Sequence, residues 1–132
     1  MTAQNPIFSG KNVLLVEDIL DNQDVIKDMS ELLGFNLDIV SNGEDAIEKW
    51  KEKKYDLIIM DVQMPKKDGY ETVKEIRELE NKKSYTPILA ITSSAFPEDR
   101  KKCFQSGMDE YLSKPITFEV FKEKLCTIFT LY

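Results

Sequence analysis

The chain has 132 residues, enough for one domain with a substantial hydrophobic core. Its 24 acidic residues outnumber its 18 lysines and arginines and give a net charge of −6, so the domain is not expected to bind nucleic acid directly. It has no histidine, which excludes histidine-based general base catalysis, histidine-ligated zinc and a phosphohistidine on this chain. No run approaches the ~20 apolar residues of a membrane span and no secretory leader begins the sequence, so we expect a soluble, cytoplasmic domain without direct membrane contact.

Short apolar runs alternate with amphipathic segments along the whole chain, after a loose N-terminal lead-in at 1–10. The runs predict strands at 12–16, 36–40, 56–60, 87–91 and 110–113. Apolar residues at helical spacing predict a helix after each strand. In chain order, the residues that indicate the helices are Val25, Ile26, Met29, Leu32 and Leu33; Ala46, Ile47 and Trp50; Tyr70, Val73 and Ile76; Pro97-Glu98-Asp99, as an opening turn; and Phe118, Phe121, Leu125 and Ile128.

This alternation predicts an α/β fold with one parallel sheet covered by helices on both faces, because the strands are apolar on both sides. With right-handed crossovers and about 25 residues per unit, the sheet is open, doubly wound and five-stranded. A closed barrel of this kind needs more than five units. In open sheets of this type the functional site lies at the carboxyl ends of the strands.

Three acids, a hydroxyl and a lysine follow the carboxyl ends of four predicted strands. The first strand is followed by Glu17-Asp18, the third by Asp61, the fourth by Thr92 and the fifth by Lys114. Two carboxylates ~4 Å apart repel each other by about 4 kcal/mol at an effective dielectric constant near 20. A pocket that holds three of them therefore either takes up a proton or binds a hard cation.

Oxygen ligands alone suit Mg²⁺, which keeps several waters and often shares a substrate phosphate. Thr92 and Lys114 would then be donors to an anion beside the metal. A metal, a lysine and a hydroxyl are together the equipment of phosphoryl transfer. With no serine, cysteine or histidine expected at the centre, the nucleophile would be a carboxylate, and its product an acyl phosphate.

Several segments of the chain, in order and at compatible spacing, resemble the receiver domain of two-component response regulators, the CheY-like family with a flavodoxin-like (βα)5 fold. The resemblance covers about 11–129. Its motifs are Val16-Glu17-Asp18, Met60-Asp61-Val62-Gln63-Met64-Pro65-Lys66-Lys67-Asp68-Gly69, Ile91-Thr92 and Lys114-Pro115. Further motifs are similar to those of receiver modules in hybrid sensor histidine kinases: Asn22-Gln23, Leu33-Gly34-Phe35 and Ser41-Asn42-Gly43-Glu44-Asp45-Ala46.

The resemblance implies a role for each residue of the site. Asp61 would accept the phosphoryl group and also bind Mg²⁺, for which Mn²⁺ could substitute. Asp18 would bind the metal directly, Glu17 directly or through water, and Gln63 through its backbone carbonyl. Lys114 would pair with the phosphoryl group and, before transfer, with Asp61.

The resemblance also implies a conformational switch and two kinds of protein partner. Thr92 would move toward the phosphoryl group, and Tyr111 would turn inward as it does. The peptide bond of Lys114-Pro115 would be cis. The phosphoryl group would come from a sensor histidine kinase or a histidine phosphotransfer protein, and the face formed by the fourth helix, fifth strand and fifth helix would contact a downstream effector. The domain would act as a phosphoacceptor in signalling and not as an enzyme.

Three rival functions share parts of this pattern. A flavodoxin-like cofactor binder needs a glycine- and hydroxyl-rich loop after the first strand, where this chain has acids that would repel phosphate. A Mg²⁺-dependent aspartyl phosphatase would need a second acid two residues after Asp61, where Gln63 stands. A degenerate scaffold would be expected to lack one of the site residues, and all are present.

Several single residues have a second, structural interpretation. Asp21 or Asn22 is expected to cap the first helix. Ile19-Leu20 could be a partner contact or loop packing, and Tyr111 could be packing alone. Trp50 is interpreted as helix-face packing. Other interpretations make Cys103 and Cys126 buried or half-buried thiols, and Gln63 and Ser94 residues that tune the lifetime of the phosphoryl group. Whether the chain is a stand-alone receiver or part of a hybrid kinase stays open.

Overall fold

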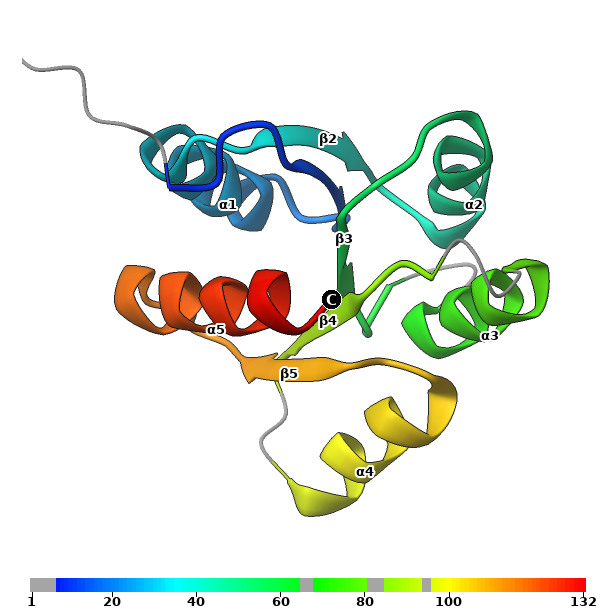
Figure 1. Cartoon of the computed structure of the whole chain (residues 1–132). Helices are drawn as coiled ribbons and strands as arrows, with labels where there is room; N and C mark the ends of the chain where they lie inside the picture. Colours follow the sequence, from blue (N-terminus) through cyan, green and yellow to red (C-terminus); the bar gives the residue numbers. More distant parts are fainter. Residues whose placement is uncertain (1–6, 65–67, 81–84, 94–95) are drawn as a thin grey trace, which may run out of the picture.

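Five parallel strands form one sheet in the order β2-β1-β3-β4-β5, as the alternation predicts. This computed structural model describes residues 7–64, 68–80, 85–93 and 96–132. The elements are β1 (Asn12–Val16), α1 (Leu20–Leu33), β2 (Asn36–Val40), α2 (Gly43–Glu52), β3 (Leu57–Asp61), α3 (Gly69–Leu79), β4 (Ile88–Thr92), α4 (Pro97–Ser106), β5 (Glu110–Ser113) and α5 (Phe118–Leu131). In Figure 1, α1 and α5 lie together on one side, and α2, α3 and α4 on the other.

Alternate side chains of the central strands face two separate hydrophobic layers. Leu14, Val16, Ile58 and Met60 belong to the layer under α2, α3 and α4. Their neighbours along the strands belong to the layer under α1 and α5, namely Val13, Leu15, Leu57 and Ile59. All are at most 1% exposed, and each such side chain contributes about 1.5–3 kcal/mol by leaving water.

Strands β3 and β4 begin and end one residue later than expected. The ladder pairs Asp61 with Ile91 and Thr92 with Ser113. Asp61 and Thr92 are therefore the last residues of their strands, and their backbones are fixed by the sheet. This one-residue difference makes both side chains part of a rigid edge.

The expected cap of α1 is wrong. The helix begins at Leu20, its N-cap position is Ile19, and no side chain caps it. The carboxylate of Glu17 instead accepts a hydrogen bond from the backbone N–H of Ile19, at 3.2 Å. The helix therefore begins directly after the acidic turn, so Asp21 lies inside it and cannot be its N-cap.

The described part of the expected lead-in packs on the domain. Residues 7–10 form a turn in which Phe8 is buried and meets Phe129 edge-on at 5.0 Å between ring centroids. Its backbone N–H donates to the carbonyl of Leu33 at 3.0 Å. Of the two cysteines, Cys103 is buried as expected, whereas Cys126 is exposed because it lies on the outer side of α5, which corrects that interpretation.

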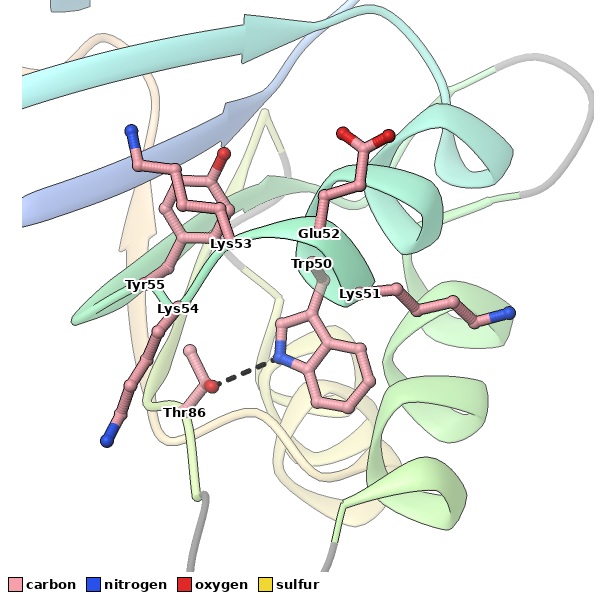
Figure 2. Close-up of a pocket in the computed structure, with 7 residues that line it drawn as sticks. All are labelled: Trp50, Lys51, Glu52, Lys53, Lys54, Tyr55 and Thr86. Atoms are coloured by element: carbon pink, nitrogen blue, oxygen red, sulfur yellow. Dashed lines mark hydrogen bonds between the residues drawn. The ribbon is translucent and has the colours of Figure 1, made fainter.

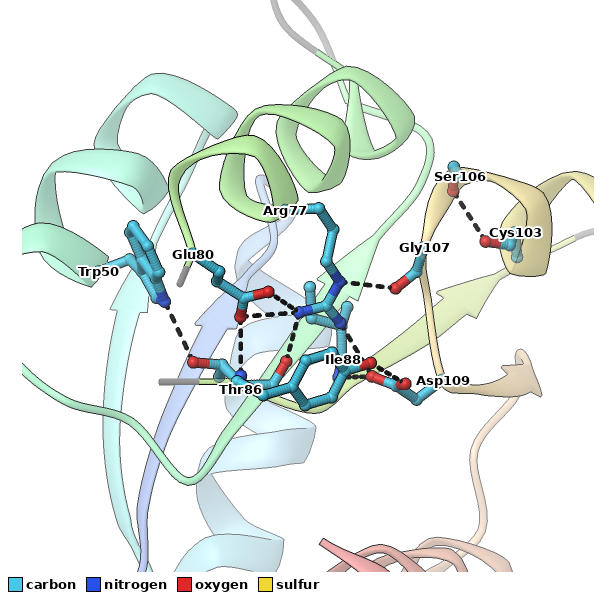
Figure 3. A network of polar contacts seen from close by, with 10 residues as sticks. Trp50, Arg77, Glu80, Thr86, Ile88, Cys103, Ser106, Gly107 and Asp109 are labelled. Carbon is cyan, nitrogen blue, oxygen red and sulfur yellow. Dashed lines mark hydrogen bonds and ion pairs between the residues drawn. The ribbon is translucent and has the colours of Figure 1, made fainter. Parts of the chain in front are cut away.

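A polar network joins α3 to the amino ends of β4 and β5, at the edge opposite the predicted site (Figure 3). Its centre is the guanidinium of Arg77, which donates to both oxygens of Glu80 and to Asp109 at 2.7–2.9 Å, and to the carbonyls of Gly107 and Thr86. The same two acids also accept hydrogen bonds from the backbone, Glu80 from the N–H of Thr86 and Asp109 from the N–H of Ile88. The network therefore fixes where β4 begins.

Trp50 lies beside this network and packs partly buried against the hydrophobic layer under α2 and α3, which confirms the packing interpretation. Its indole N–H donates to the hydroxyl of Thr86 at 3.1 Å (Figure 2). Together they form one wall of a hollow of about 400 Å³, whose other lining residues are Lys51, Glu52, Lys53, Lys54 and Tyr55. This hollow lies at the amino edge of the sheet, away from Glu17, Asp18 and Asp61.

Candidate functional site

The three predicted acids meet at the carboxyl edge of the sheet. Glu17 and Asp18 follow β1, and Asp61 ends the neighbouring β3. One carboxylate oxygen from each lies within 4.8 Å of the others. Glu17 is fully buried and Asp61 is 1% exposed, so water does little to screen the repulsion between their negative charges.

Lys114, the residue that follows β5, brings a positive charge to this pocket. Its Nζ lies 3.2 Å from Oε1 of Glu17 and 3.6 Å from Oδ2 of Asp61. Its backbone N–H donates to the carbonyl of Thr92 at 2.7 Å, and the peptide bond that follows it, to Pro115, is cis as expected. The lysine is thus held by the main chain where it contacts both acids.

Asp61 takes up a proton more readily than an ordinary carboxyl group does. Burial, followed by the hydrogen bond with Glu17, raises the pKa of Asp61 from its ordinary 3.8 to about 7. The backbone N–H of Gln63, which donates to Oδ1 of Asp61 at 3.1 Å, and the charge of Lys114 both oppose this rise. Asp61 therefore holds a proton for much of the time at neutral pH.

A divalent cation fits this set of residues. The Oδ1 atom of Asp18 is buried and makes no hydrogen bond. Such an atom is costly unless a ligand satisfies it. It belongs to a cluster of three carboxylates, and carboxylate oxygens are the ligands that Mg²⁺ prefers. Asp18, Asp61 and Glu17 are thus placed to hold the ion.

Thr92 and Gln63 lie beside this centre, and Tyr111 lies on β5, the strand next to that of Thr92. Thr92 ends β4, 1% exposed. The side-chain oxygen of Gln63 accepts a hydrogen bond from the hydroxyl of Ser93 at 2.7 Å, which links the β3 and β4 loops. Tyr111 on β5 packs partly buried against the layer under α4, with the guanidinium of Arg100 5.9 Å from its ring centroid. Ser94 and the Pro65-Lys66-Lys67 part of the motif lie outside the described residues.

Gly69 packs against the backbone of the site, a role that its place in the motif does not indicate. A Cβ atom at Gly69 would lie 2.7 Å from Cα of Val62 and 2.8 Å from the carbonyl oxygen of Asp61. The N-terminus of α3 therefore packs directly on the peptide that carries Asp61. Glycine at a helix start usually suggests a turn, and nothing in the sequence distinguishes that role from this close approach.

Replacing Gly69 by alanine is expected to destabilise the domain by about 1–3 kcal/mol, because the added methyl group has no room unless the Asp61-Val62 backbone shifts. The check is urea unfolding of G69A beside K74A, a change at an exposed position of the same helix. Equal stability of the two variants would show that the close approach is not a constraint.

The raised pKa of Asp61 predicts a pH dependence of stability. Between about pH 4 and 7 the folded chain binds more protons at Asp61 than the unfolded chain, so the free energy of unfolding falls as pH rises and levels off above about 7. We expect Asp61→Asn to remove this fall. Urea unfolding without divalent ions, at pH 5 and pH 8, measures it as the difference between wild type and variant. An equal fall in both proteins would contradict the assignment.

Comparison with known proteins identifies the family of this chain. Residues 13–126 match the family model of the response regulator receiver domain, and the chain belongs to that family. The peroxide stress-activated histidine kinase mak1 of Schizosaccharomyces pombe is 43% identical over an alignment of 116 positions that covers 84% of this chain and 7% of the kinase. The chain likewise spans only 16% of "Probable histidine kinase 1" of Oryza sativa subsp. indica, at 35% identity over 92% of this chain.

Solved structures show the same fold. The receiver domain of the sensor histidine kinase PA1611 from Pseudomonas aeruginosa PAO1, with a magnesium ion coordinated in its active-site cleft, is 39% identical, with a TM-score of 0.82 over 90% of this chain and 97% of that one. A chain in the co-crystal structure of the Saccharomyces cerevisiae phosphotransfer protein Ypd1 with the receiver domain of Ssk1 is 32% identical, with a TM-score of 0.83 over 89% and 88%. Among the described residues of our chain, no helix has the length and apolar character for crossing a membrane.

Proposed function

We propose that Asp61 accepts a phosphoryl group from a phosphohistidine on a partner protein, with Mg²⁺ held by Asp18, Asp61 and the backbone carbonyl of Gln63, and by Glu17 directly or through water. The observation that carries the proposal is a buried carboxylate, Asp61, that has both a cation-binding acid cluster and the Lys114 ammonium within reach. Membership of the receiver family supports it, as does the magnesium ion in the related PA1611 domain.

In the reaction, an oxygen of the Asp61 carboxylate attacks phosphorus in line with the bond from phosphorus to the histidine nitrogen of the partner. That bond breaks, its electron pair returns to the imidazole, and a mixed anhydride of Asp61 and phosphate forms. Mg²⁺ offsets negative charge on the transferring oxygens. Lys114, 3.6 Å from Asp61, is placed to bind one of those oxygens, and Thr92 to donate to another.

The same geometry supports a phosphoacceptor role over a phosphatase. The position two residues after Asp61 holds Gln63, whose amide cannot deliver a proton to a leaving group. Its side-chain oxygen instead accepts a hydrogen bond from the hydroxyl of Ser93. We therefore expect self-phosphorylation and slow loss of the phosphoryl group, without turnover of external substrates.

The output of the domain would be a shift of the face formed by α4, β5 and α5. Thr92 ends β4 beside the site, and Tyr111 lies on the adjacent β5, so a movement of Thr92 would reach the packing of α4 against Tyr111. Phe96 and Phe104 are exposed on this side, at 69% and 42%, and would contact an effector. The phosphoryl donor would be a histidine kinase or a phosphotransfer protein, and the co-crystal of Ypd1 with a receiver domain supports a partner of the second kind. We expect this exchange to take place in the cytoplasm.

The direct test is incubation with Mg²⁺ and acetyl phosphate, followed by intact-mass measurement. We expect one added phosphoryl group, labile to base. It should be absent without a divalent ion, restored by Mn²⁺ and lost in Asp61→Asn. Glu98→Gln, a neutralised acid at an exposed position of α4, is the matched control and should be modified normally. Absence of an adduct from acetyl phosphate and from a phosphorylated donor protein would refute the proposal.

A further inference from the structure

Gln23 on the first turn of α1 reaches back to the acidic turn. Its side-chain Nε2 donates to the backbone carbonyl of Glu17 at 2.7 Å, in a partly buried setting. Its own backbone N–H donates to the carbonyl of Ile19 at 3.0 Å, as the first turn of the helix requires. The side chain therefore joins the helix to the end of β1, across the residues that carry the metal-binding acids.

Several hydrogen bonds hold the acidic turn, including the one from Lys114 to the Glu17 carboxylate described above. The backbone N–H of Glu17 donates to the carbonyl of Val40 on β2 at 3.0 Å, which continues the sheet. The carboxylate of Glu17 accepts the N–H of Ile19 at 3.2 Å. The bond from Gln23 to the Glu17 carbonyl adds a contact in which a side chain from outside the turn donates to the backbone of the turn.

Holding the Glu17 carbonyl fixes the peptide plane between Glu17 and Asp18, which includes the Cα atom of Asp18, and so restricts the directions in which the Asp18 side chain can leave the backbone. Asp18 carries the buried Oδ1 atom without a hydrogen-bond partner, the atom that a cation would satisfy. We propose that Gln23 is a positioning residue for the divalent cation: it presents Asp18 to the metal without contacting the metal itself. This inference rests on the cation site of the proposed function.

The test is a titration with MgCl₂ followed by the amide NMR shifts of Asp18 and Asp61. Gln23→Met keeps the length and volume of the side chain and removes the donor. We expect it to weaken Mg²⁺ binding about 10-fold, because loss of a residue that orients a metal ligand typically costs 10–100-fold in metal affinity. Gln105→Met, the same change at an exposed position of α4, is the matched control and should bind as wild type does.

A second variant and thermal unfolding separate positioning from simple stabilisation of α1. Gln23→Lys restores a donor to the Glu17 carbonyl and is expected to bind Mg²⁺ more tightly than Gln23→Met. A Gln23→Met protein that melts earlier but binds Mg²⁺ with unchanged affinity would overturn the inference, as would equal affinity of the two variants. If Gln23→Met does not fold, Gln23→Lys is compared with Gln23→Asn, whose shorter amide cannot reach the carbonyl, and equal affinity again overturns the inference. Wild-type protein that shows no Mg²⁺-dependent shift at Asp18 or Asp61 would instead refute the cation site itself.

Discussion

Arg77→Met is expected to lower the free energy of unfolding by about 3–5 kcal/mol, the cost of breaking a buried ion pair from one side. The Arg77 side chain is only 17% exposed, and its two acid partners, Glu80 and Asp109, are 6% and 11% exposed. Methionine preserves most of the packing but leaves both carboxylates without their cation. The ring of Tyr85, whose centroid lies 4.2 Å from the guanidinium carbon and whose hydroxyl donates to Asp109, loses its contact too.

Urea unfolding measures this loss, with Lys74→Met on the exposed side of the same helix as the control. The two acids also hold the backbone N–H groups of Thr86 and Ile88, so amide hydrogen exchange at the start of β4 should speed up in Arg77→Met. A loss below about 1 kcal/mol, similar to that of Lys74→Met, would show that the network contributes no more than a surface ion pair.

Lys114→Met is expected to slow modification of the domain by acetyl phosphate about 10²- to 10³-fold, the usual cost of removing one donor that stabilises developing charge. Lys114 lies 3.2 Å from Glu17 and 3.6 Å from Asp61. Its charge lowers the pKa of Asp61, so the substitution should also raise that pKa further above about 7 and leave less carboxylate to attack.

The two effects of Lys114 differ in their pH dependence. If protonation of Asp61 alone limited the variant, raising the pH to about 9 would restore the wild-type rate. We expect most of the defect to persist, because the donor to the transferring oxygens is still absent. Lys124→Met, which breaks the more exposed ion pair with Glu110 at 3.0 Å, should be modified at the wild-type rate. Full recovery of Lys114→Met at high pH would contradict a direct role in transfer.

The edge of the sheet that carries the site was predictable from sequence because it depends on local patterns. Apolar runs that end in Glu17-Asp18, Asp61 and Thr92 fix both the strands and their carboxyl ends, and parallel pairing then brings those ends together. Ile19 as the N-cap of α1 was not predictable, since its side chain cannot cap a helix and no other side chain does so.

Contacts between residues distant in sequence could not be predicted from one chain. Arg77 donates to Asp109, which lies 32 positions further along the chain, and no local sequence pattern indicates that the two side chains pair. Gly69 was recognisable as a helix start but not as a point of contact with the Asp61 peptide, because that contact depends on how α3 packs. Gln23 belonged to a motif of the resemblance, yet its bond to Glu17 requires the helix to begin at Leu20, earlier than expected.

The central claim, that Asp61 is the phosphoacceptor, is tested most directly by locating the phosphoryl group. After modification with acetyl phosphate and Mg²⁺, borohydride converts an acyl phosphate of aspartate into homoserine, which tandem mass spectrometry can place in the sequence. We predict homoserine at position 61 and at no other aspartate. Homoserine at a different position, or a phosphoryl group that resists borohydride because it lies on a hydroxyl or an amine, would contradict the account.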